Sequence, residues 1–371
     1  MKELNENKIS FIICKNNDMF YEECLLYLNE LIVPNGFEVD VLAISDAKTM
    51  ISGYNEGMKA SDAKYKIYMH QDVFIVNKEF ISDILSVFQN NPEVGMLGVI
   101  GGVDLPQNAL IADAWNVGKT YASNFAATFE VVYNYSPSRE YTEVEAVDGM
   151  LMMTQYDLEW REDLDLKWDF YDISQSMEFR RKGYKVAIPR QNTPWCIHDC
   201  GHSKMICYDA NREVFLKEYG DFFGERFSPF LNIEKMQLEE KLFDTLKMYM
   251  ESGDVDEVCS VLDGFSEIKF RNTNIQYLFN FCEIYKEEKR LGVAKECQFI
   301  NGERWEELVN KYNIIKFSLR RIENEICKDE LIQVMIENIN KTISCIAVYL
   351  IAIRACVDKK EIEKLLTIYK K

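Results

Sequence analysis

The three histidines of the chain are confined to two short segments, His70-Gln71-Asp72 and Trp195–His202 (WCIHDCGH). Histidines scattered over a surface would not gather in this way. The first segment follows an apolar run, and a carboxylate such as Asp72 there can bind Mg²⁺ or Mn²⁺, hard ions that bridge phosphate oxygens. We therefore expect Asp72 and one histidine to form a metal–diphosphate site. The alternative is that Asp72 only closes a turn.

A second interpretation of the histidine segments is a structural zinc site. In an extended strand, the side chains at alternate positions point to the same side, and these would be Cys196, His198, Cys200 and His202. Zinc ligands are usually separated by two to four residues rather than by one. The roles of Cys196, Cys200 and His202 therefore stay open, as does the question whether His70 replaces a metal ligand.

Asp172 is the candidate general base. It lies in Trp168–Ile173 (WDFYDI), at the expected first turn of a helix that continues through SQSMEFRRKGY. The N–H groups and dipole of a helix N-terminus hold a carboxylate ionised, as a base must be before it acts. The neighbouring Asp169 is expected to raise the pKa of Asp172 toward neutral pH. The plainer alternative is that Asp172 only caps the helix.

Asp148 and Gly149 form a further candidate pair within the strand-like run Glu143–Thr154 (EVEAVDGMLMMT). A glycine in a strand allows a ligand to approach the backbone closely, although a simple bulge would use the same residue type. The pair is therefore expected either to face a bound ligand or to mark a bulge.

Apolar runs in the first half of the chain predict the strands that would position these residues. The runs are Ile9–Cys14, Val39–Ile44, Tyr65–Met69 and Val94–Gly101, with another at Lys185–Pro189. Residues at helical spacing separate them. Alternating strands and helices predict an α/β layer fold with a mostly parallel sheet, whose ligands bind beyond the carboxyl ends of the strands.

Two parts of the chain depart from this alternation. Residues 104–142 are rich in aromatic side chains, including Trp115, and show no clear period. We expect a long functional loop that contributes to an acceptor site, unless the aromatics simply pack the core. After Pro229 proline disappears and Glu, Lys, Leu and Ile recur at helical spacing. Residues 229–371 are therefore predicted to be an all-helical domain for acceptor binding or oligomerisation, following a catalytic domain at 1–228.

The bulk properties restrict the class of ligand and the compartment. The 371 residues carry a formal net charge of −18, which repels nucleic-acid phosphates. An anionic nucleotide would therefore need local neutralisation, for which a divalent cation is suited. The N-terminus lacks the pattern of a secretory signal, and the longest apolar run, near residues 343–353, is too short to span a bilayer. We expect a cytoplasmic protein whose 11 cysteines are mostly reduced and buried.

The order of these segments resembles the inverting, family-2-like glycosyltransferases of the GT-A type, particularly the streptomycin-biosynthesis-type branch. The resemblance runs from Ile9 to about His202. The segments that match it are, in chain order, Ile9–Cys14, Ser45-Asp46, Gly53–Gly57 (the N-x-G helix), His70-Gln71-Asp72 (the D-x-D motif), Asp148-Gly149, Tyr171–Ser174 with Arg180 and Gly183-Tyr184 (the segment of the catalytic base), and His198. Two departures stand out: His70 replaces the first acid of D-x-D, and Tyr171 and Ser174 replace the acids that flank the base.

This resemblance implies a GT-A (nucleotide-diphospho-sugar transferase) Rossmann-like domain with a mostly parallel mixed sheet. The predicted all-α domain that follows it has no counterpart in the shortest members of the family. The resemblance implies donor binding by Cys14, Ser45, Asp46, Asn55, Gln71, Asp72, Asp148 and Gly149. It further implies that Asp72 and His198 hold Mn²⁺ or Mg²⁺ and that Asp172 is the catalytic base. We also expect Trp115, in the aromatic-rich segment, and Tyr171 to face the acceptor.

The expected activity is transfer of a sugar from a nucleotide-diphosphate sugar, a UDP-sugar first among them, to a hydroxyl of a protein or glycan acceptor, with inversion. The altered D-x-D motif motivates a different class, a non-catalytic protein that keeps the nucleotide-sugar fold and acts as an interaction or assembly module through its helical domain, for instance in a homo-oligomer. A dinucleotide-dependent enzyme is disfavoured, because no G-x-G-x-x-G motif opens the first helix.

Overall fold

The structure is a computed structural model that describes residues 3–111, 114–123, 128–133, 140–200, 207–223 and 233–265, together with scattered positions between 268 and 326. Contacts between residues divide the chain into two compact units. The first contains most of residues 1–231, and the second contains helices α6 (Ile233–Ser252) and α7 (Val255–Asp263). Each unit is described by itself.

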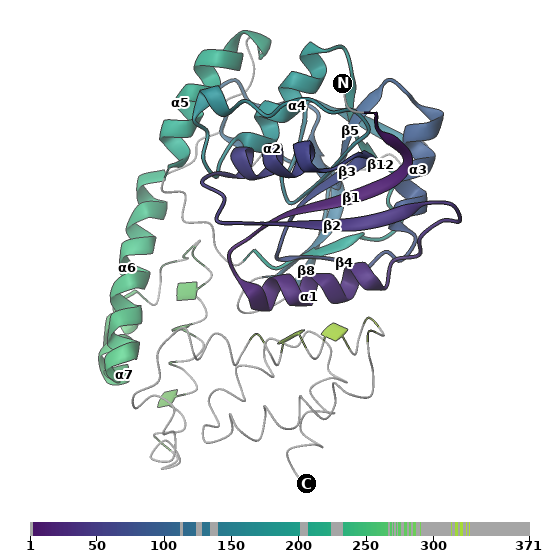
Figure 1. The fold of residues 1–371 in the computed structure, drawn as a ribbon. Coiled ribbons are helices and arrows are strands. Elements are labelled where there is room, and N and C mark those ends of the chain that lie inside the picture. Colours follow the sequence, from purple (N-terminus) through teal and green to yellow (C-terminus); the bar gives the residue numbers. More distant parts are fainter. Residues whose placement is uncertain are drawn as a thin grey trace. The chain divides into compact units, whose positions relative to one another are not determined.

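A seven-stranded sheet forms the centre of the first unit (Figure 1). In spatial order it consists of β2 (Glu38–Ser45), β1 (Asn5–Lys15), β3 (Ala63–His70), β11 (Leu151–Thr154), β5 (Val94–Gly98), β12 (Lys185–Pro189) and β9 (Tyr141–Val144). The apolar runs of the sequence thus lie in strands, and their side chains are buried. The prediction of an α/β fold is confirmed.

The sheet is mixed to a greater degree than we expected. β1 pairs in parallel with β2 and β3, and β12 pairs in parallel with β5. In contrast, β11 lies antiparallel between β3 and β5, and β9 lies antiparallel to β12. The sheet is mixed, as expected, but the prediction that most of its strand pairs are parallel is wrong. The reason is that the run predicted at Glu143–Thr154 divides into separate strands, one of which enters the sheet in the opposite direction.

A second sheet brings distant segments to the carboxyl end of β3. Its spatial order is β10 (Ala146–Val147), β6 (Ile100–Gly102), β7 (Val117–Ser123), β13 (Cys196–His198) and β4 (Val73–Ile75), and β8 (Thr128–Val132) pairs with β7. Residues 104–142 therefore do not form one long loop, since they supply β7 and β8 and the first residues of β9. The antiparallel pairing of β13 with β4 places His198 opposite Val73.

Helices cover the first unit on both sides of β1 and β2. They are α1 (Asp18–Asn29), α2 (Met50–Ala60), α3 (Phe80–Asn90), α4 (Tyr171–Arg181) and α5 (Tyr208–Tyr219), with short 3₁₀ turns η2 (Glu162–Leu164) and η3 (Gly220–Phe222). Figure 1 shows α2 on one side of these two strands and α1 on the other.

Helix α2 packs unusually closely on β1 because two glycines lie one turn apart on its inner face. A Cβ on Gly53 would lie 2.4 Å from the sulfur of Cys14, and one on Gly57 would lie 2.3 Å from Ile12 Cγ2. The helix begins with a capping box in which the side chains of Thr49 and Ser52 satisfy each other's backbone N–H groups. This packing fixes the carboxyl end of β1 beside the first turn of α2.

In the second unit, helix α6 buries one face, including Met236, Phe243 and Leu246. Most of the chain after residue 265 lies outside the described residues, so the all-helical domain at 229–371 stays a prediction. The apolar run near residues 343–353 also lies there. Within the described ranges, no helix combines the length and the apolar composition needed to cross a membrane.

Candidate active site

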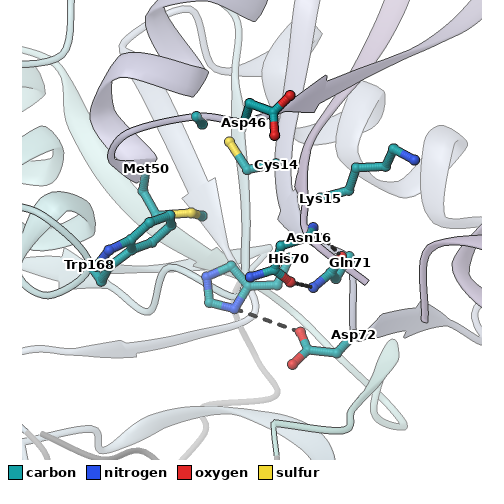
Figure 2. A pocket seen from close by; sticks show the side chains of 10 residues that line it. Cys14, Lys15, Asn16, Asp46, Met50, His70, Gln71, Asp72 and Trp168 are labelled. Atoms are coloured by element: carbon teal, nitrogen blue, oxygen red, sulfur yellow. Dashed lines mark hydrogen bonds and ion pairs between the residues drawn. The ribbon is translucent and has the colours of Figure 1, made fainter. Parts of the chain in front are cut away.

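A cavity of about 450 Å³ opens beside the carboxyl ends of β1, β2 and β3 (Figure 2). The residues that line it are Cys14, Lys15, Asn16, Asp46, Ala47, Met50, His70, Gln71, Asp72 and Trp168. Four of these, Cys14, Asp46, Gln71 and Asp72, were expected from the sequence to bind a donor. The cavity lies at the carboxyl ends of these strands, which is where the sheet of an α/β fold binds its ligands.

One side of the cavity carries the ends of β1 and β2. Asp46 follows β2 in the left-handed region (φ 60°), which aspartate tolerates better than most residues. Cys14 lies beneath it, and burial, followed by the charge of Glu56, raises the pKa of its thiol to about 12. Cys14 is therefore a neutral, weakly polar wall of the cavity rather than a nucleophile.

Gln71 connects the ends of β1 and β3. Its side-chain oxygen accepts hydrogen bonds from the backbone N–H groups of Asn16 and Asn17, each at 2.9 Å. Its amide group donates to the side chain of Asn16. Gln71 therefore holds the ends of β1 and β3 together where they line the cavity. Direct contact between Gln71 and a donor stays a prediction.

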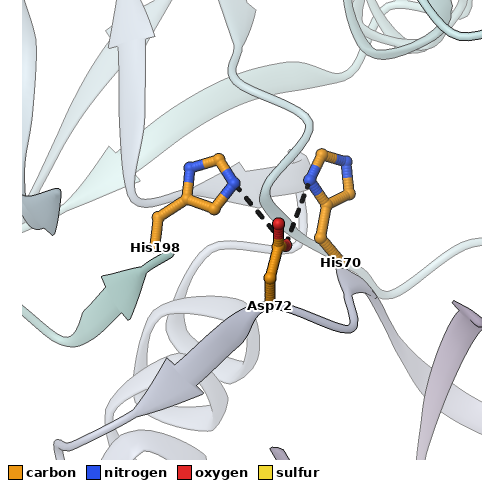
Figure 3. Close-up of side chains that lie close together, drawn as sticks. All are labelled: His70, Asp72 and His198. Carbon is orange, nitrogen blue, oxygen red and sulfur yellow. Dashed lines mark ion pairs between the residues drawn. The ribbon is translucent and has the colours of Figure 1, made fainter. Parts of the chain in front are cut away.

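His70, Asp72 and His198 form a cluster at the other side of the cavity (Figure 3). Asp72 Oδ1 lies 3.7 Å from His198 Nε2 and 3.9 Å from His70 Nδ1, and one ligand atom from each residue lies within 4.8 Å of the others. The Oδ1 atom is buried, yet it accepts no hydrogen bond within the described part of the chain.

This geometry fits a metal ion. Two ligands at about 2.1 Å from one ion stand roughly 3.0 to 3.5 Å apart when they subtend an angle of 90–110°. The two separations from Asp72 Oδ1 are too long for hydrogen bonds and only slightly longer than this range, whereas the remaining pair, the two histidines, lies within 4.8 Å and must approach further to share an ion. The cluster therefore satisfies the prediction that Asp72 and His198 come together, and it adds His70 as a third possible ligand. The site alone does not identify the metal.

Backbone hydrogen bonds hold the three residues of the cluster in place. His70 is the last residue of β3, and its N–H donates to the carbonyl of Met150 at 3.1 Å. Asp72 follows in the turn before β4, and its carbonyl accepts the N–H of Asp199 at 2.8 Å. His198 ends β13, which pairs with β4. Two segments that are far apart in the sequence are thus joined by one strand pair.

The zinc alternative finds no support in this arrangement. Cys196 is buried, its sulfur lies beside the hydroxyl of Thr120, and Cys200 is exposed. Neither cysteine belongs to the cluster that could hold a metal among the described residues, and His202 lies outside them.

The side chain of Tyr171 fixes the orientation of the His70 ring. The Tyr171 hydroxyl hydrogen-bonds His70 Nε2, which leaves Nδ1 directed at Asp72. Burial lowers the pKa of His70, partly offset by the charge of Asp72, so that the imidazole is neutral at pH 7. A neutral ring whose second nitrogen is hydrogen-bonded is the form in which histidine binds metal ions.

Gly149 leaves the space that Tyr171 occupies. A Cβ at position 149 would lie 2.1 Å from the Tyr171 hydroxyl oxygen and 2.6 Å from its ring. We expect Gly149→Ala to displace Tyr171, release His70 and weaken divalent-metal binding by about 10- to 100-fold, the range found for ligand-orienting groups. Isothermal titration calorimetry with Mn²⁺ measures this loss.

Gly220→Ala is the matched control for this prediction, because a Cβ at Gly220 would meet nothing within 4 Å and its backbone is helical. That variant should bind Mn²⁺ as the wild type does. Unchanged Mn²⁺ affinity in a folded Gly149→Ala protein would show that Tyr171 does not orient a metal ligand.

Asp172 lies in the first turn of α4, as expected, but it is not the N-cap, a position that Phe170 occupies. Its Oδ2 accepts the N–H of Gly149 at 2.8 Å. Burial and, second, the negative charge of Asp148 raise the pKa of Asp172 to about 7. The expectation that Asp169 raises this pKa is wrong, since that carboxyl is held by Asn211 and does not contribute.

Three further residues expected at the site serve elsewhere or stand apart. Asn55 is buried in α2, where its amide donates to the carbonyl of Trp160 and accepts the Trp160 N–H. Ser45 ends β2 without lining the described cavity. Trp115 lies against Gly102 in the second sheet, 3.6 Å from a Cβ built there. Donor contact by Asn55 and Ser45, and acceptor contact by Trp115, therefore stay predictions that the geometry does not support.

Trp168 is the largest of the lining residues that sequence reasoning did not single out; the others are Lys15, Asn16, Ala47 and Met50. Its side chain is 50% exposed and lies beside Met50 at the edge of the cavity (Figure 2). The segment that carries it is bracketed by two non-glycine residues in the left-handed region, Asp165 (φ 52°) and Phe170 (φ 64°). Such strain is stored preferentially at functional sites. The aromatic residue type of Trp168 was the signal available in the sequence. Its position at the cavity edge depends on an irregular loop, which the sequence pattern does not predict.

Comparisons with known proteins give a family and weak structural similarities. A family model described as "Glycosyltransferase like family" matches residues 10–219. The "Crystal structure of S. aureus TarS 1-349 in complex with UDP" is 10% identical, with 98% of this chain and 91% of that chain covered and a TM-score of 0.34. The "Crystal structure of S. aureus TarS 1-349" is 12% identical, with coverages of 77% and 92% and a TM-score of 0.30. None of the curated proteins matches the chain.

Proposed function

We propose that this chain, which belongs to the glycosyltransferase-like family, transfers a sugar from a nucleotide-diphosphate sugar to a hydroxyl of an acceptor with inversion at the anomeric carbon. One observation carries the proposal. At the strand ends a buried carboxylate, Asp72, lies between two imidazoles, and Tyr171, which hydrogen-bonds one of them, precedes in α4 a second carboxylate, Asp172, whose pKa is about 7 and which does not line the described cavity. A cation site beside a titratable base is what metal-assisted group transfer requires.

The donor would lie across the cavity between its two sides. The nucleoside would lie against Cys14 and Asp46, and the diphosphate would reach Asp72 and His198. When bound there, Mn²⁺ or Mg²⁺ would neutralise negative charge that develops on the departing diphosphate. The net charge of −18 makes this local neutralisation necessary. A UDP-sugar is the donor to test first, and the choice of base and sugar is part of the proposal.

Asp172 would act as the general base. In the proposed step the acceptor hydroxyl oxygen forms a bond to the anomeric carbon, its proton passes to the Asp172 carboxylate, and the bond from that carbon to the diphosphate oxygen breaks. A base with a pKa of about 7 is partly ionised at neutral pH and still accepts a proton readily. A single displacement of this kind inverts the configuration.

The acceptor would enter past Trp168 and Tyr171. The half-exposed indole of Trp168 offers an apolar face to a sugar ring or a peptide side chain at the cavity edge. We propose a glycan or protein acceptor on this basis. A separate helical domain at 229–371 that binds the acceptor or a second copy of the chain, and a cytoplasmic location, remain parts of the same proposal.

The proposal is tested by a thermal-shift screen of UDP-, GDP- and dTDP-sugars, each with and without Mn²⁺. A ligand that binds only the folded chain raises the melting temperature by mass action, by an amount that corresponds to about 2.7 kcal/mol at 100 times its Kd. We expect one donor class to give a shift that requires Mn²⁺. Absence of a shift with every donor would contradict the proposal, as would a shift that EDTA leaves unchanged.

A further inference from the structure

We infer that the cluster of His70, Asp72 and His198 is a site for a first-row transition ion rather than for Mg²⁺, and that His70 is the residue that makes it so. The inference rests on the proposed function only for the presence of a cation in this cavity. It concerns the chemistry of the ligands, which can be measured without any sugar nucleotide.

The ligand set is rich in nitrogen. One carboxylate oxygen and two imidazole nitrogens converge, and the ligand atoms lie within 4.8 Å of one another. Mg²⁺ takes oxygen ligands and retains several waters, whereas imidazole suits Fe²⁺, Ni²⁺, Cu²⁺ and Zn²⁺, and the affinity of a site with nitrogen ligands rises from Mn²⁺ through Co²⁺ to Ni²⁺. With aspartate at position 70, two carboxylates would offer oxygen to the ion. Histidine at this position therefore changes the class of ion that the site prefers.

The three residues approach from one side. Asp72 Oδ1 stands between the two rings, 3.7 Å from His198 and 3.9 Å from His70, and the ring centroids are 5.5 Å apart (Figure 3). Three protein ligands would leave further coordination positions of an ion free for other ligands. His70 and Asp72 both line the cavity, so a ligand bound in the cavity could take those positions.

The orientation of His70 argues that it is a ligand rather than a packing residue. The Tyr171 hydroxyl occupies Nε2, and only Nδ1 is directed at Asp72. Gly149 preserves this contact, because any Cβ there would collide with Tyr171. At the same time the Asp72 Oδ1 atom is buried without a hydrogen bond from the described residues. An ion between these atoms accounts for both observations.

The test uses the full chain, free of any histidine tag and stripped of metal with a chelator. Isothermal titration calorimetry with Co²⁺, Mn²⁺ and Mg²⁺, each alone, gives three affinities. We expect Co²⁺ to bind more tightly than Mn²⁺, and Mg²⁺ to bind at least about 100-fold more weakly than Co²⁺. Bound Co²⁺ should also show a visible absorption spectrum that differs from that of the aqueous ion.

The decisive variant is His70→Asp, which should weaken Co²⁺ binding by about tenfold and strengthen Mg²⁺ binding, so that the selectivity falls. Asp46→Asn is the matched control, because Asp46 lines the same cavity but lies outside the cluster, and its metal affinities should not change. If His70→Asp does not fold, Tyr171→Phe serves instead, with an expected 10- to 100-fold loss of Co²⁺ affinity.

Mg²⁺ that binds the wild type as tightly as Co²⁺ would overturn the inference, and so would a folded His70→Asp protein with unchanged affinities. These outcomes are separate from those for the proposed function. Sugar transfer that Mg²⁺ supports as well as Mn²⁺ would contradict the metal preference alone. The expected metal order without any binding of sugar nucleotides would contradict the proposed function alone.

Discussion

Asp172→Asn is expected to lower the rate of sugar transfer by about 100-fold or more while donor affinity changes little. Asparagine keeps the size of the side chain, and its amide oxygen can still accept the N–H of Gly149, a bond of 2.8 Å in the wild type. It cannot accept the proton of an acceptor hydroxyl. Steady-state transfer rates combined with calorimetry of donor binding separate the two effects.

The pH dependence of the rate gives a second measure of the same residue. Because the pKa of Asp172 is about 7, transfer should slow as the pH falls below that value and the carboxylate becomes protonated. The charge of Asp148 is the second cause of the raised pKa. Asp148→Asn should therefore move the acidic limb of the profile for kcat to lower pH.

Stability distinguishes a catalytic base from a helix cap. The pKa of Asp172 is raised from 3.8 in the unfolded reference to about 7, so the folded chain retains a proton that the unfolded chain loses between these values. Stability from this group is complete below about pH 4 and declines as the pH rises through 7. The raised pKa of Asp172 corresponds to at most about 4 kcal/mol of folding stability. Screening by solvent reduces this contribution to about 1–3 kcal/mol.

Asp172→Asn should therefore make the chain more stable at pH 8 than the wild type. A carboxylate that merely caps the helix would give little change in stability at any pH, because asparagine caps a helix about as well as aspartate. Asp169→Asn is the matched control, since Asp169 is also partly buried, and burial raises its pKa. Normal transfer by Asp172→Asn would show that another residue is the base. Loss of transfer in Asp169→Asn alone would show the same.

Asp72→Ala is expected to abolish metal-dependent donor binding, with an affinity loss of about 100-fold or more. Asp72 is the one carboxylate among the three possible ligands, so its removal leaves two imidazoles and no anionic ligand. The backbone should be unaffected, because the hydrogen bond that holds the turn goes from Asp199 N–H to the Asp72 carbonyl. Calorimetry with UDP and GDP, with and without Mn²⁺, measures the effect.

Asp46→Ala is the control for this prediction, since Asp46 is an acid that lines the same cavity but lies outside the metal cluster. It should weaken donor binding without making it independent of Mn²⁺. Donor binding by Asp72→Ala that is undiminished and insensitive to EDTA would contradict the role of Asp72.

The sequence predicted the strands better than it predicted their pairing. The apolar runs that become β1, β2, β3 and β12 are long enough to be recognised. β7 and β8 were missed because they lie in an aromatic-rich segment without clear alternation, and Gly118 adopts a left-handed conformation (φ 107°) in β7. The antiparallel direction of β11 depends on long-range packing that no local pattern encodes.

The candidate site was predicted in part for the same reason. The grouping of histidines in two motifs was sufficient to suggest that Asp72 and His198 share a site, and the structure brings them within 3.7 Å. The contact of Tyr171 with His70, and the space that Gly149 provides for it, arise from the packing of α4 against the sheet. The surroundings of Asn55, which bonds the backbone of Trp160, could not be predicted, because a helical asparagine looks the same in sequence whether it faces a ligand or a buried backbone.

The central claim is tested most directly by following turnover of the donor that binds best, with water as the smallest hydroxyl acceptor. Proton NMR reports both the release of the nucleotide diphosphate and the anomeric configuration of the sugar as it forms. We predict metal-dependent release with inverted configuration, lost in Asp72→Ala and slowed by about 100-fold or more in Asp172→Asn. Release with retained configuration would contradict the single displacement. No release from any donor that binds would contradict the enzyme and favour a non-catalytic interaction protein.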